Sequence, residues 1–489
     1  MPINSFLYPG AKVTLPYEVD NSCRFNAADS PYFARATSAS GNQRKFTISV
    51  WLKMDIHASG ASHFIFDTGD SADYFKVYFT TEPYLKIVGR ISNSNVLELI
   101  PSKGFRDPTA WFHLYIAVDT TQGTASNRVK VYINGVQETS FGTATYPNQN
   151  TDFVVNDTGE PIEVGINSGH SSGESYDGYM AEYVFVDGAA QAISDFGEFD
   201  EDSPTIWIPK DVSGIAVNPD GANGFYLDFK DSSNLGNDAA GGTDFSENNI
   251  VAADQATDTP TNNFATLNPL WRSNFANDGV YSEGNCKLTF TSANSDKGYG
   301  VSTMGVTSGK WYWEIKLPTI YRAGTGVADA NRLAGFSATF WDSDPSYGIN
   351  FNNNGNVNEN NTATSSWASA LSDNDIVMFA LDMDNHRLWY GINGTWQDSG
   401  DPTSGATGTG DFTTQISDQS HLNTGEFIFP LVIDGSTTGK ASFEMNFGGC
   451  PAFSISSGNA DANGYGNFEY SVPANFYSIC TKNLAEYGG

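Results

Sequence analysis

The amino-acid sequence predicts an all-β protein in which two antiparallel, jellyroll-like β-sandwich domains stand in tandem, joined by an acidic, irregular connector. Three observations predict this class. The chain contains 49 Gly and 20 Pro, which favour turns, and 13% of its residues are aromatic. Apolar and polar residues alternate along many short segments, whereas helical periodicity is nearly absent. The length of 489 residues suffices for two or three domains of roughly 100–200 residues each.

A first block of strands is predicted between residues 46 and 187. The segment FTISVWLKMD (46–55) places Phe46, Ile48, Val50 and Leu52 on one face and Thr47, Ser49, Trp51 and Lys53 on the other. The same alternation continues in WFHLYIAVD (111–119), NRVKVYINGVQ (127–137) and YMAEYVFVD (179–187). Asn134-Gly135 suits a tight type I′ hairpin turn. These segments therefore indicate one β-sandwich.

A second block of strands is predicted from about residue 285 onward. The segment KWYWEIKL (310–317) directs Trp311, Trp313, Ile315 and Leu317 to one side as an apolar layer. Burial of such a layer contributes on the order of 1.5–3 kcal/mol per side chain, so we expect these rings to fill a core. Asn393-Gly394 marks another hairpin.

Residues 231–261 separate the two blocks. They carry six acidic residues and no Lys or Arg, so we expect an exposed connector, which Phe245 and Ile250 can pin to a neighbouring surface. The predicted organisation is an N-terminal attachment segment at 1–20, a jellyroll at 21–205, the connector at 206–267, a second sandwich at 268–483 and a tail at 484–489.

The formal net charge of −31, from 56 acidic and 25 basic residues, argues against nucleic acid or anionic lipid as a partner. No apolar run is long enough to insert into a membrane, and the start of the chain lacks the pattern of a secretory signal. Synthesis in the cytoplasm fits the four widely spaced cysteines, which we expect to be buried thiols. A Cys450–Cys480 bridge is the alternative.

Several motifs resemble known families. The second half is similar to a SPRY domain over about residues 268–483, through KWYWEIKL, then ALDMD leading into the Asn-Gly hairpin, then FPLVIDG and ASFEMNFGGCPAF. The first half resembles a concanavalin A-like, laminin-G-type jellyroll through FTISVWLKM, WFHLYIAVDTTQGTASNRVKVYINGVQ and YDGYMAEYVFVDGAA. With SCRFNAADSPYFAR, FGEFDEDSPTIWIPKD, NGFYLDFKDSS and ICTKNLAE, the order resembles a tandem in virion proteins of tailed bacteriophages, many of them marine.

Paired carboxylates are the pattern relevant to catalysis, because some concanavalin A-like jellyrolls are glycanases that use two of them. The segment GEFDED (197–202), with Glu198, Asp200, Glu201 and Asp202, sits in a context typical of a turn. Asp382 and Asp384 share a face of a predicted strand, where two close carboxylates can differ in pKa. The alternative is that both are simply polar residues that point outward from this strand. Neither pair has a third partner, and no nucleophile motif is present. We therefore expect no enzyme activity, with glycoside hydrolysis as the alternative.

The segment DTGDSAD offers Asp67, Asp70 and Asp73 within seven residues. Crowded carboxylates are suitable ligands for Ca²⁺, and some laminin-G-like domains bind calcium at loop carboxylates. A solvated acidic turn is the alternative.

Ligand binding is expected on loops, where Trp and Tyr rings pack against sugars and amides bond their hydroxyls. An Asn-rich stretch, NFNNNGNVNENN (350–361), is suited to turns or to hydrogen bonding with a polar ligand. The candidate residues are Trp341, Tyr347, Asn352, Asn353, Asn354, Trp367 and Trp396. Each ring taken alone also suits simple packing.

The resemblance implies a virion structural protein on the particle surface, of the tail or head fibre adhesin type. Its expected partners are other virion proteins and host-surface glycans or proteins, with a homo-oligomer, by family analogy a trimer. The alternatives are a polysaccharide depolymerase and a purely architectural decoration or connector protein.

Overall fold

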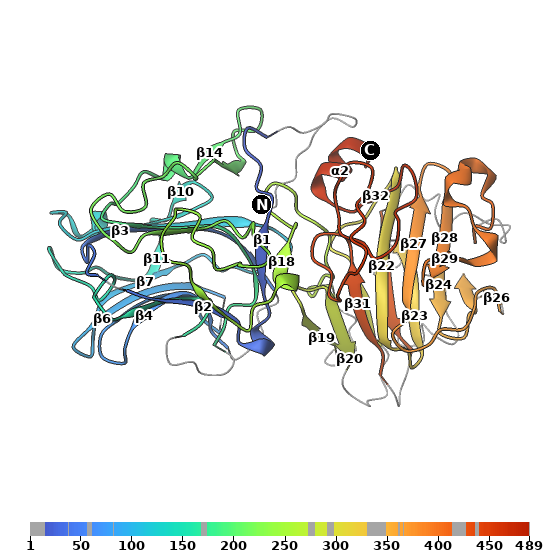
Figure 1. The fold of residues 1–489 in the computed structure, drawn as a ribbon, viewed down its shortest axis with the longest axis horizontal. Coiled ribbons are helices and arrows are strands. Elements are labelled where there is room, and N and C mark those ends of the chain that lie inside the picture. The colour runs from blue at the N-terminus through green and yellow to red at the C-terminus, as the bar shows by residue number, and fades with distance from the viewer. Residues whose placement is uncertain are drawn as a thin grey trace. The chain divides into compact units, whose positions relative to one another are not determined.

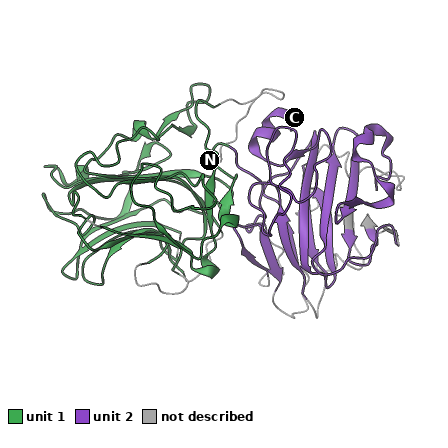
Figure 2. Ribbon diagram, viewed as in Figure 1, with its two compact units in different colours: residues 1–4, 15–261 green, residues 5–14, 262–489 purple. Residues whose placement is uncertain are grey.

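In the computed structural model the described residues are 15–37, 39–55, 61–81, 83–167, 174–271, 279–290, 298–329, 349–359, 362–364, 366–412, 427–435 and 440–488. They form two compact units, unit 1 over 15–261 and unit 2 over 262–488 (Figure 2). Both are β-sandwiches, so the predicted fold class is confirmed. Within the described ranges, no helix is both long and apolar enough to cross a membrane.

Unit 1 contains two eight-stranded sheets, seen as stacked layers in Figure 1. The strands of the first sheet are β1 (Ser22–Phe25), β3 (Lys45–Met54), β8 (Phe112–Asp119), β9 (Val129–Ile133), β10 (Val136–Gln137), β13 (Gly178–Asp187), β16 (Phe225–Leu227) and β18 (Gln255–Ala256). Their order is β10-β9-β8-β3-β13-β1-β18, and β16 pairs with β13.

The second sheet of unit 1 faces the first. Its strands are β2 (Tyr32–Ala36), β4 (His63–Gly69), β5 (Tyr74–Phe79), β6 (Leu85–Ile91), β7 (Ser94–Pro101), β11 (Phe141–Thr145), β12 (Pro161–Val164) and β17 (Ser246–Asn248), in the order β11-β7-β6-β5-β4-β12-β2-β17. A separate hairpin joins β14 (Gly197–Phe199) to β15 (Trp207–Pro209). Short 3-10 helices span Ala27–Asp29, Ala125–Asn127, Ile193–Asp195 and Ala252–Asp254.

Alternation places the core of unit 1 where the sequence predicts it. Phe46, Ile48, Val50 and Leu52 of β3 are fully buried between the two sheets. Asn134-Gly135 forms the β9–β10 turn with φ values of 49° and 74°, as an Asn-Gly type I′ turn requires. The strand assignments from 46 to 187 are therefore confirmed.

The outer face of the first sheet is also buried, which the sequence did not predict. Trp51 and Lys53 of β3 are 2% and 1% exposed because residues after β13 return over this face. Lys53 forms an ion pair of 2.6 Å with Asp258, and the indole N–H of Trp111 donates to the same carboxylate.

The prediction that residues 206–267 form an exposed connector is therefore wrong. Residues 206–261 belong to unit 1 and add β16, β17 and β18 to its two sheets. Phe245 and Ile250 join its core, as expected of the residues proposed to pin the segment. The acidic residues that suggested exposure are in part buried with partners, as with Arg35–Asp238 at 3.0 Å.

Unit 2 contains an eight-stranded and a six-stranded sheet. The strands of the larger sheet are β19 (Gly279–Ser282), β20 (Lys287–Phe290), β22 (Lys310–Thr319), β27 (Ile376–Asp382), β28 (Arg387–Ile392), β29 (Thr395–Trp396), β31 (Ser442–Asn446) and β32 (Tyr477–Ser478). They run β19-β20-β31-β22-β27-β28-β29, with β32 parallel to β22.

The smaller sheet has the order β21-β30-β23-β24-β25-β26. Its strands are β21 (Gly298–Val301), β23 (Ala323–Asp329), β24 (Ile349–Asn352), β25 (Val357–Glu359), β26 (Thr362–Thr364) and β30 (Ile428–Asp434). Two 3-10 helices span Gln397–Ser399 and Pro402–Thr407, and helix α2 spans Thr481–Tyr487.

The aromatic strand β22 lies at the centre of unit 2. Trp311, Trp313, Ile315 and Leu317 are fully buried, so the predicted apolar layer is confirmed. Tyr312 and Glu314, on the opposite face, are also fully buried, because residues after β31 cover that face. Glu314 accepts hydrogen bonds from the Tyr312 hydroxyl and from the backbone N–H groups of Glu469 and Tyr470.

Both predicted terminal segments are partly structured. Residues 1–14 lie outside the described residues, but Val19 is buried and exchanges hydrogen bonds with Thr261. The predicted tail at 484–489 is largely helix α2, whose Tyr487 stacks on Tyr477 with ring centroids 3.9 Å apart.

The four cysteines form no disulfide and are buried, which confirms the expected thiols. The alternative Cys450–Cys480 bridge does not form. Burial raises the pKa of the Cys480 thiol to about 12.

Candidate functional site: a pocket on the outer face of unit 1

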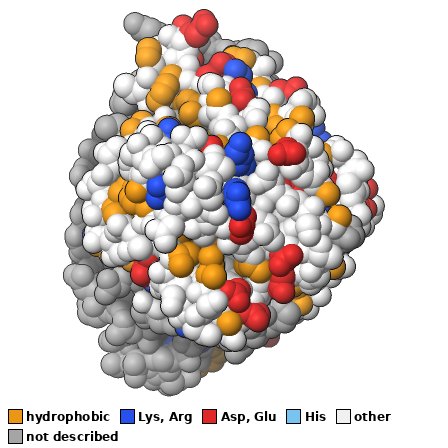
Figure 3. Space-filling model, turned by 90° about the vertical axis from the view of Figure 1, so that its left-hand side faces the viewer, with side chains coloured by type: hydrophobic (Ala, Val, Ile, Leu, Met, Phe, Trp, Pro, Cys, Tyr) orange, Lys and Arg blue, Asp and Glu red, His pale blue; other side chains and the backbone are white. Residues whose placement is uncertain are grey.

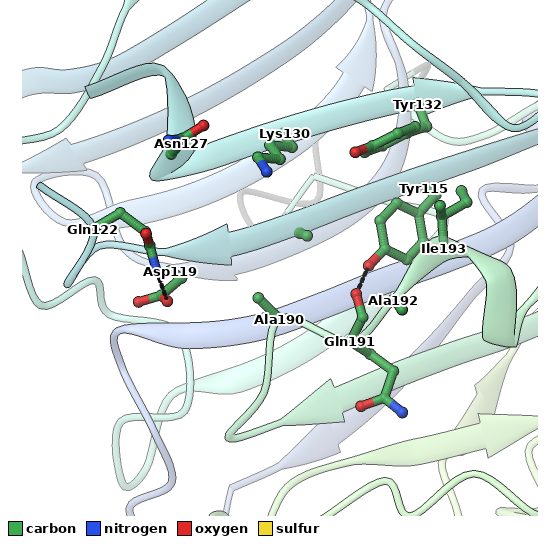
Figure 4. Close-up of a pocket in the computed structure, with 11 residues that line it drawn as sticks. Tyr115, Asp119, Gln122, Asn127, Lys130, Tyr132, Ala190, Gln191, Ala192 and Ile193 are labelled. Carbon is green, nitrogen blue, oxygen red and sulfur yellow. Dashed lines mark hydrogen bonds between the residues drawn. The ribbon is translucent and has the colours of Figure 1, made fainter. Parts of the chain in front are cut away.

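A pocket of about 400 Å³ opens on the outer face of the first sheet of unit 1 (Figure 4). It lies over β8 and β9, between the turn that joins them and the loop that follows β13. The residues that line it are Tyr115, Ala117, Asp119, Gln122, Asn127, Lys130, Tyr132, Ala190, Gln191, Ala192 and Ile193.

Strand alternation brings the floor of the pocket together. Leu114, Ile116 and Val118 of β8 point into the core, so Tyr115, Ala117 and Asp119 point outward. The antiparallel register sets Tyr115 opposite Tyr132 and Ala117 opposite Lys130. Small side chains at Ala117, Ala190 and Ala192 leave room between the larger ones, and this room is the hollow.

Hydrogen bonds fix the two walls. The Tyr115 hydroxyl donates to the carbonyl of Gln191, and Thr47 holds the same loop by bonds of 2.9 Å with Ala189 and Gln191. On the other side, the guanidinium of Arg128 donates to the carbonyls of Gln122, Gly123 and Pro147. The pocket is therefore formed before any ligand arrives, which lowers the ordering cost of binding.

The charged groups of the pocket differ in how they are compensated. Asp119 accepts from the amide and hydroxyl of Thr121 and from the side chain of Gln122. Burial raises the pKa of Asp119, but these hydrogen bonds and the charge of Lys45 outweigh it and lower the pKa below its usual value. Asp119 is thus a carboxylate at neutral pH.

Lys130 has no such compensation. No side chain in the described ranges forms an ion pair with it, and it is half-buried on β9. In Figure 4 its ammonium lies between Asn127 and Tyr132, and the Tyr132 hydroxyl points to the same side of the hollow. The pocket therefore combines aromatic rings, amides and hydroxyls with one uncompensated positive charge.

Residues 28–193 match the family model described as the concanavalin A-like lectin/glucanases superfamily. All the residues that line the pocket fall in this concanavalin A-like region. No curated protein matches the chain.

Three solved structures are similar in part. The SPRY domain of human HERC1 is 17% identical, with 37% of this chain and 96% of that chain covered and a TM-score of 0.26. The heptameric SAP-like pentraxin of Limulus polyphemus is 16% identical, with 38% and 76% covered and a TM-score of 0.25. Stonustoxin is 19% identical, with 37% and 27% covered and a TM-score of 0.26. Similarity at this level says nothing of ligand or activity.

The ligand-binding residues predicted from the sequence fall between residues 341 and 396, outside the matched residues 28–193. Trp341 and Tyr347 are outside the described residues. Trp367 is half-buried and packs against Phe351 and Phe412, with ring centroids 5.4 and 5.3 Å apart. Trp396 is half-buried against Tyr312. Both described rings pack on neighbouring side chains, which favours simple packing over ligand binding.

The asparagines form a turn. Asn352 is 8% exposed, and its side-chain oxygen accepts from the backbone N–H groups of Asn354 and Asn356. Asn353 is half-buried and Asn354 is exposed. Turn formation thus accounts for Asn352, and ligand binding by Asn353 and Asn354 stays a prediction.

The expected calcium ligands do not assemble into a site. Asp67, on β4 in the concanavalin A-like region, is buried and ion-paired with Lys76 at 3.0 Å. Asp70 accepts from the backbone N–H groups of Ala72 and Asp73, and Asp73 accepts from that of Ser92. Within the described part of the chain, no three His, Cys, Asp or Glu residues are grouped to hold a metal. The three residues stabilise a hairpin and its turn instead.

The two carboxylate pairs are engaged elsewhere. Glu198 lies on β14, where the sequence indicated only a turn, and is 3.6 Å from Lys210 at the surface. Asp382 is buried and ion-paired with Lys310 at 2.8 Å. Asp384 accepts from the backbone N–H of Gly309. None of these residues lines the pocket.

A buried Ser-His contact near the pocket is structural. The Ser49 hydroxyl lies 2.8 Å from His113 Nε2, and the Trp207 indole N–H donates to His113 Nδ1 at 3.1 Å. Because an indole can only donate, Nδ1 accepts and Nε2 carries the proton. Burial lowers the pKa of His113 to about 3. The ring is therefore neutral and has no free nitrogen with which to deprotonate Ser49.

Sequence reasoning missed the pocket although a signal was present. The outward positions of 111–119 and 127–137 hold Tyr115, Asp119, Lys130 and Tyr132, a mixture suited to a polar ligand. The loop at 190–193 completes the site from far along the chain, since Gln191 lies 76 residues after Tyr115. Strand alternation does not predict that these two segments meet.

Proposed function

We propose that this chain is a non-enzymatic carbohydrate-binding protein on the particle of a tailed bacteriophage, where the pocket of unit 1 binds host-surface glycan. The observation that carries the proposal is the preformed pocket over β8 and β9. The placement on a virion is supported by the resemblance of the sequence, and the lectin-like character by the family match over 28–193.

The composition of the pocket supports a sugar as the ligand. Sugar rings pack on aromatic faces while amides and hydroxyls bond to their hydroxyl groups. Tyr132 offers a half-buried ring beside that of Tyr115, with centroids 5.5 Å apart. Gln122 and Asn127 are exposed at the rim and supply amides. A volume of about 400 Å³ is within the usual range of small-ligand sites.

The charges support binding over cleavage. Glycoside hydrolysis ordinarily needs two carboxylic groups that flank the bond, one of them with a raised pKa. Asp119 is the single carboxylate that lines the pocket, and its pKa is lowered rather than raised. Asp119 is also engaged by Thr121 and Gln122. This arrangement holds a ligand but lacks a general acid.

The test is adsorption and glycan-array binding with purified full-length protein. We expect the wild type to bind surface polysaccharide of the host and to compete with virions for host cells. The double variant Tyr132→Ala/Asn127→Ala should lose at least about tenfold in affinity, because it removes a stacking surface and a hydrogen-bonding group. Tyr321→Ala, which removes a tyrosine that is 49% exposed in unit 2, serves as the control.

Three outcomes contradict the proposal. Equal loss in the control variant, or none in the double variant, rules out this pocket as the binding site. Release of reducing ends from the polysaccharide indicates a depolymerase instead. Burial of the pocket against neighbouring subunits in a cryo-EM map of the particle indicates the architectural role.

Self-association is part of the proposal, since multiple copies raise avidity for a repeating glycan. The expected state is a trimer. Light scattering on the purified chain measures it directly, and a monomer at micromolar concentration contradicts it.

A further inference from the structure

We infer that the pocket of unit 1 selects an acidic saccharide, in which a carboxylate or sulfate on the sugar contacts the ammonium of Lys130. This inference rests on the proposed function, since it names the class of glycan that the same pocket takes.

The first argument is charge compensation within the pocket. Asp119 stays negatively charged, but its oxygens already accept hydrogen bonds from Thr121 and Gln122, and Lys45 stands opposite it on β3. Lys130 has no ion-pair partner in the described ranges. The ammonium of Lys130 is therefore the charged group of the lining that lacks a partner in the described ranges, although the whole chain carries −31. An anionic group on the ligand is what balances this ammonium.

The second argument is the position of the other hydrogen-bond donors of the pocket. The Tyr115 hydroxyl is committed to the carbonyl of Gln191, whereas the Tyr132 hydroxyl makes a bond of 3.3 Å to Gln137 near the surface. The side chain of Asn127 makes no hydrogen bond within the described ranges. Lys130 lies between Asn127 and Tyr132 in Figure 4. The side chains of Lys130 and Asn127 thus offer donors that have no hydrogen-bond partner in the described ranges, and the Tyr132 hydroxyl points to the same side of the hollow. Such donors suit an anionic oxygen group.

The third argument is where Lys130 sits. It projects from a regular strand whose backbone is held on both sides by β8 and β10, so its base is fixed by the sheet. Half-burial reduces screening by water, and a charge-assisted hydrogen bond is stronger there than on an open surface. Lysine acts as a compact point charge, which accommodates either a carboxylate or a sulfate.

The experiment compares acidic oligosaccharides with their neutral counterparts on the full-length protein. The probes are oligosaccharides that contain glucuronate, galacturonate, sialate or sulfated galactose, each paired with the form made by carboxyl reduction or desulfation. Binding is measured by calorimetry or by saturation-transfer NMR. We expect at least one acidic member to bind about tenfold or more tighter than its neutral partner, and the chemical class of that member identifies the anionic group.

Variants assign the effect to Lys130. Lys130→Gln should abolish the preference for the acid by weakening the acidic form far more than the neutral one, and Lys130→Arg should retain part of the preference. Lys103→Gln is the matched control, because it removes the same charge from a lysine whose side chain is 55% exposed in unit 1.

The outcomes separate this inference from the proposed function. If neutral members bind as well as acidic ones, or if Lys130→Gln keeps the preference, the acidic ligand is wrong while glycan binding stands. If the protein binds no member of either kind, both fall together.

Discussion

Whether the role of a single residue in this protein can be predicted depends on how far away its partners lie in the sequence. Phe46, Ile48 and Trp313 were predicted as core residues because alternation is local, and each is fully buried. The polar residues on the outer faces were not predictable in the same way. Lys53 pairs with Asp258, 205 residues away, and nothing in either local pattern announces the other. Sequence reasoning therefore identifies buried apolar residues far better than it identifies the partners of buried polar residues.

Glu182 gives a prediction at this scale. It is 3% exposed and accepts from the hydroxyls of Tyr226 and Tyr17. Burial raises its pKa to about 7, against the lowering effect of these two hydrogen bonds. Because the folded pKa exceeds the unfolded value, the contribution of Glu182 to stability is fully present below about pH 4.5 and is lost as pH rises through about 7.

Urea unfolding of the wild type and Glu182→Gln at several pH values measures this effect. The free energy of unfolding of the wild type should fall relative to that of the variant by on the order of 3 kcal/mol between pH 4.5 and pH 8. A constant difference across this range contradicts the assignment.

The same limit of prediction applies to strands and to the segments that cover them. Strands with clear alternation were predicted, whereas the segments that cover the outer faces were not, because they are largely irregular and their apolar residues do not alternate. In unit 1 the covering segment contributes β16 and β18, and in unit 2 it contributes β32. The pocket arises at the boundary of this cover, where small residues at 190 and 192 leave the outer face of β8 and β9 accessible.

The cover of unit 2 gives the second prediction. Glu314 anchors it by accepting the backbone N–H groups of Glu469 and Tyr470, and Glu314→Gln replaces one acceptor oxygen by a donor. We expect a loss of about 2 kcal/mol in stability and faster hydrogen exchange at these two amides. Glu486→Gln, a half-buried residue of α2, is the control and should leave both amides protected. Unchanged exchange in Glu314→Gln shows that the cover is held by other contacts.

At the scale of the whole molecule, sequence reasoning predicted two tandem sandwiches and an acidic surface. Figure 3 shows acidic, basic and apolar side chains interspersed on the face it draws. The boundary between the units was less predictable. The predicted jellyroll ends at residue 205, whereas unit 1 of the structure ends at Thr261.

Truncation tests this boundary. A chain that ends at residue 205 loses Tyr226, Phe245 and Asp258, and it exposes Trp51 and Trp111. We expect it to aggregate or to lack a cooperative thermal transition, whereas a chain that ends at residue 261 should unfold cooperatively. Equal behaviour of the two chains contradicts the assignment of 206–261 to unit 1.

The central claim is that the outer face of β8 and β9 holds a sugar. The most direct measurement is a crystal structure of the full chain with the tightest-binding oligosaccharide of the panel described above. The account predicts a sugar ring against Tyr132, with its anionic group at Lys130 and its hydroxyls near Asn127 and Gln122. A sugar bound at the Trp367 and Trp396 loops of unit 2, with the pocket of unit 1 empty, contradicts it.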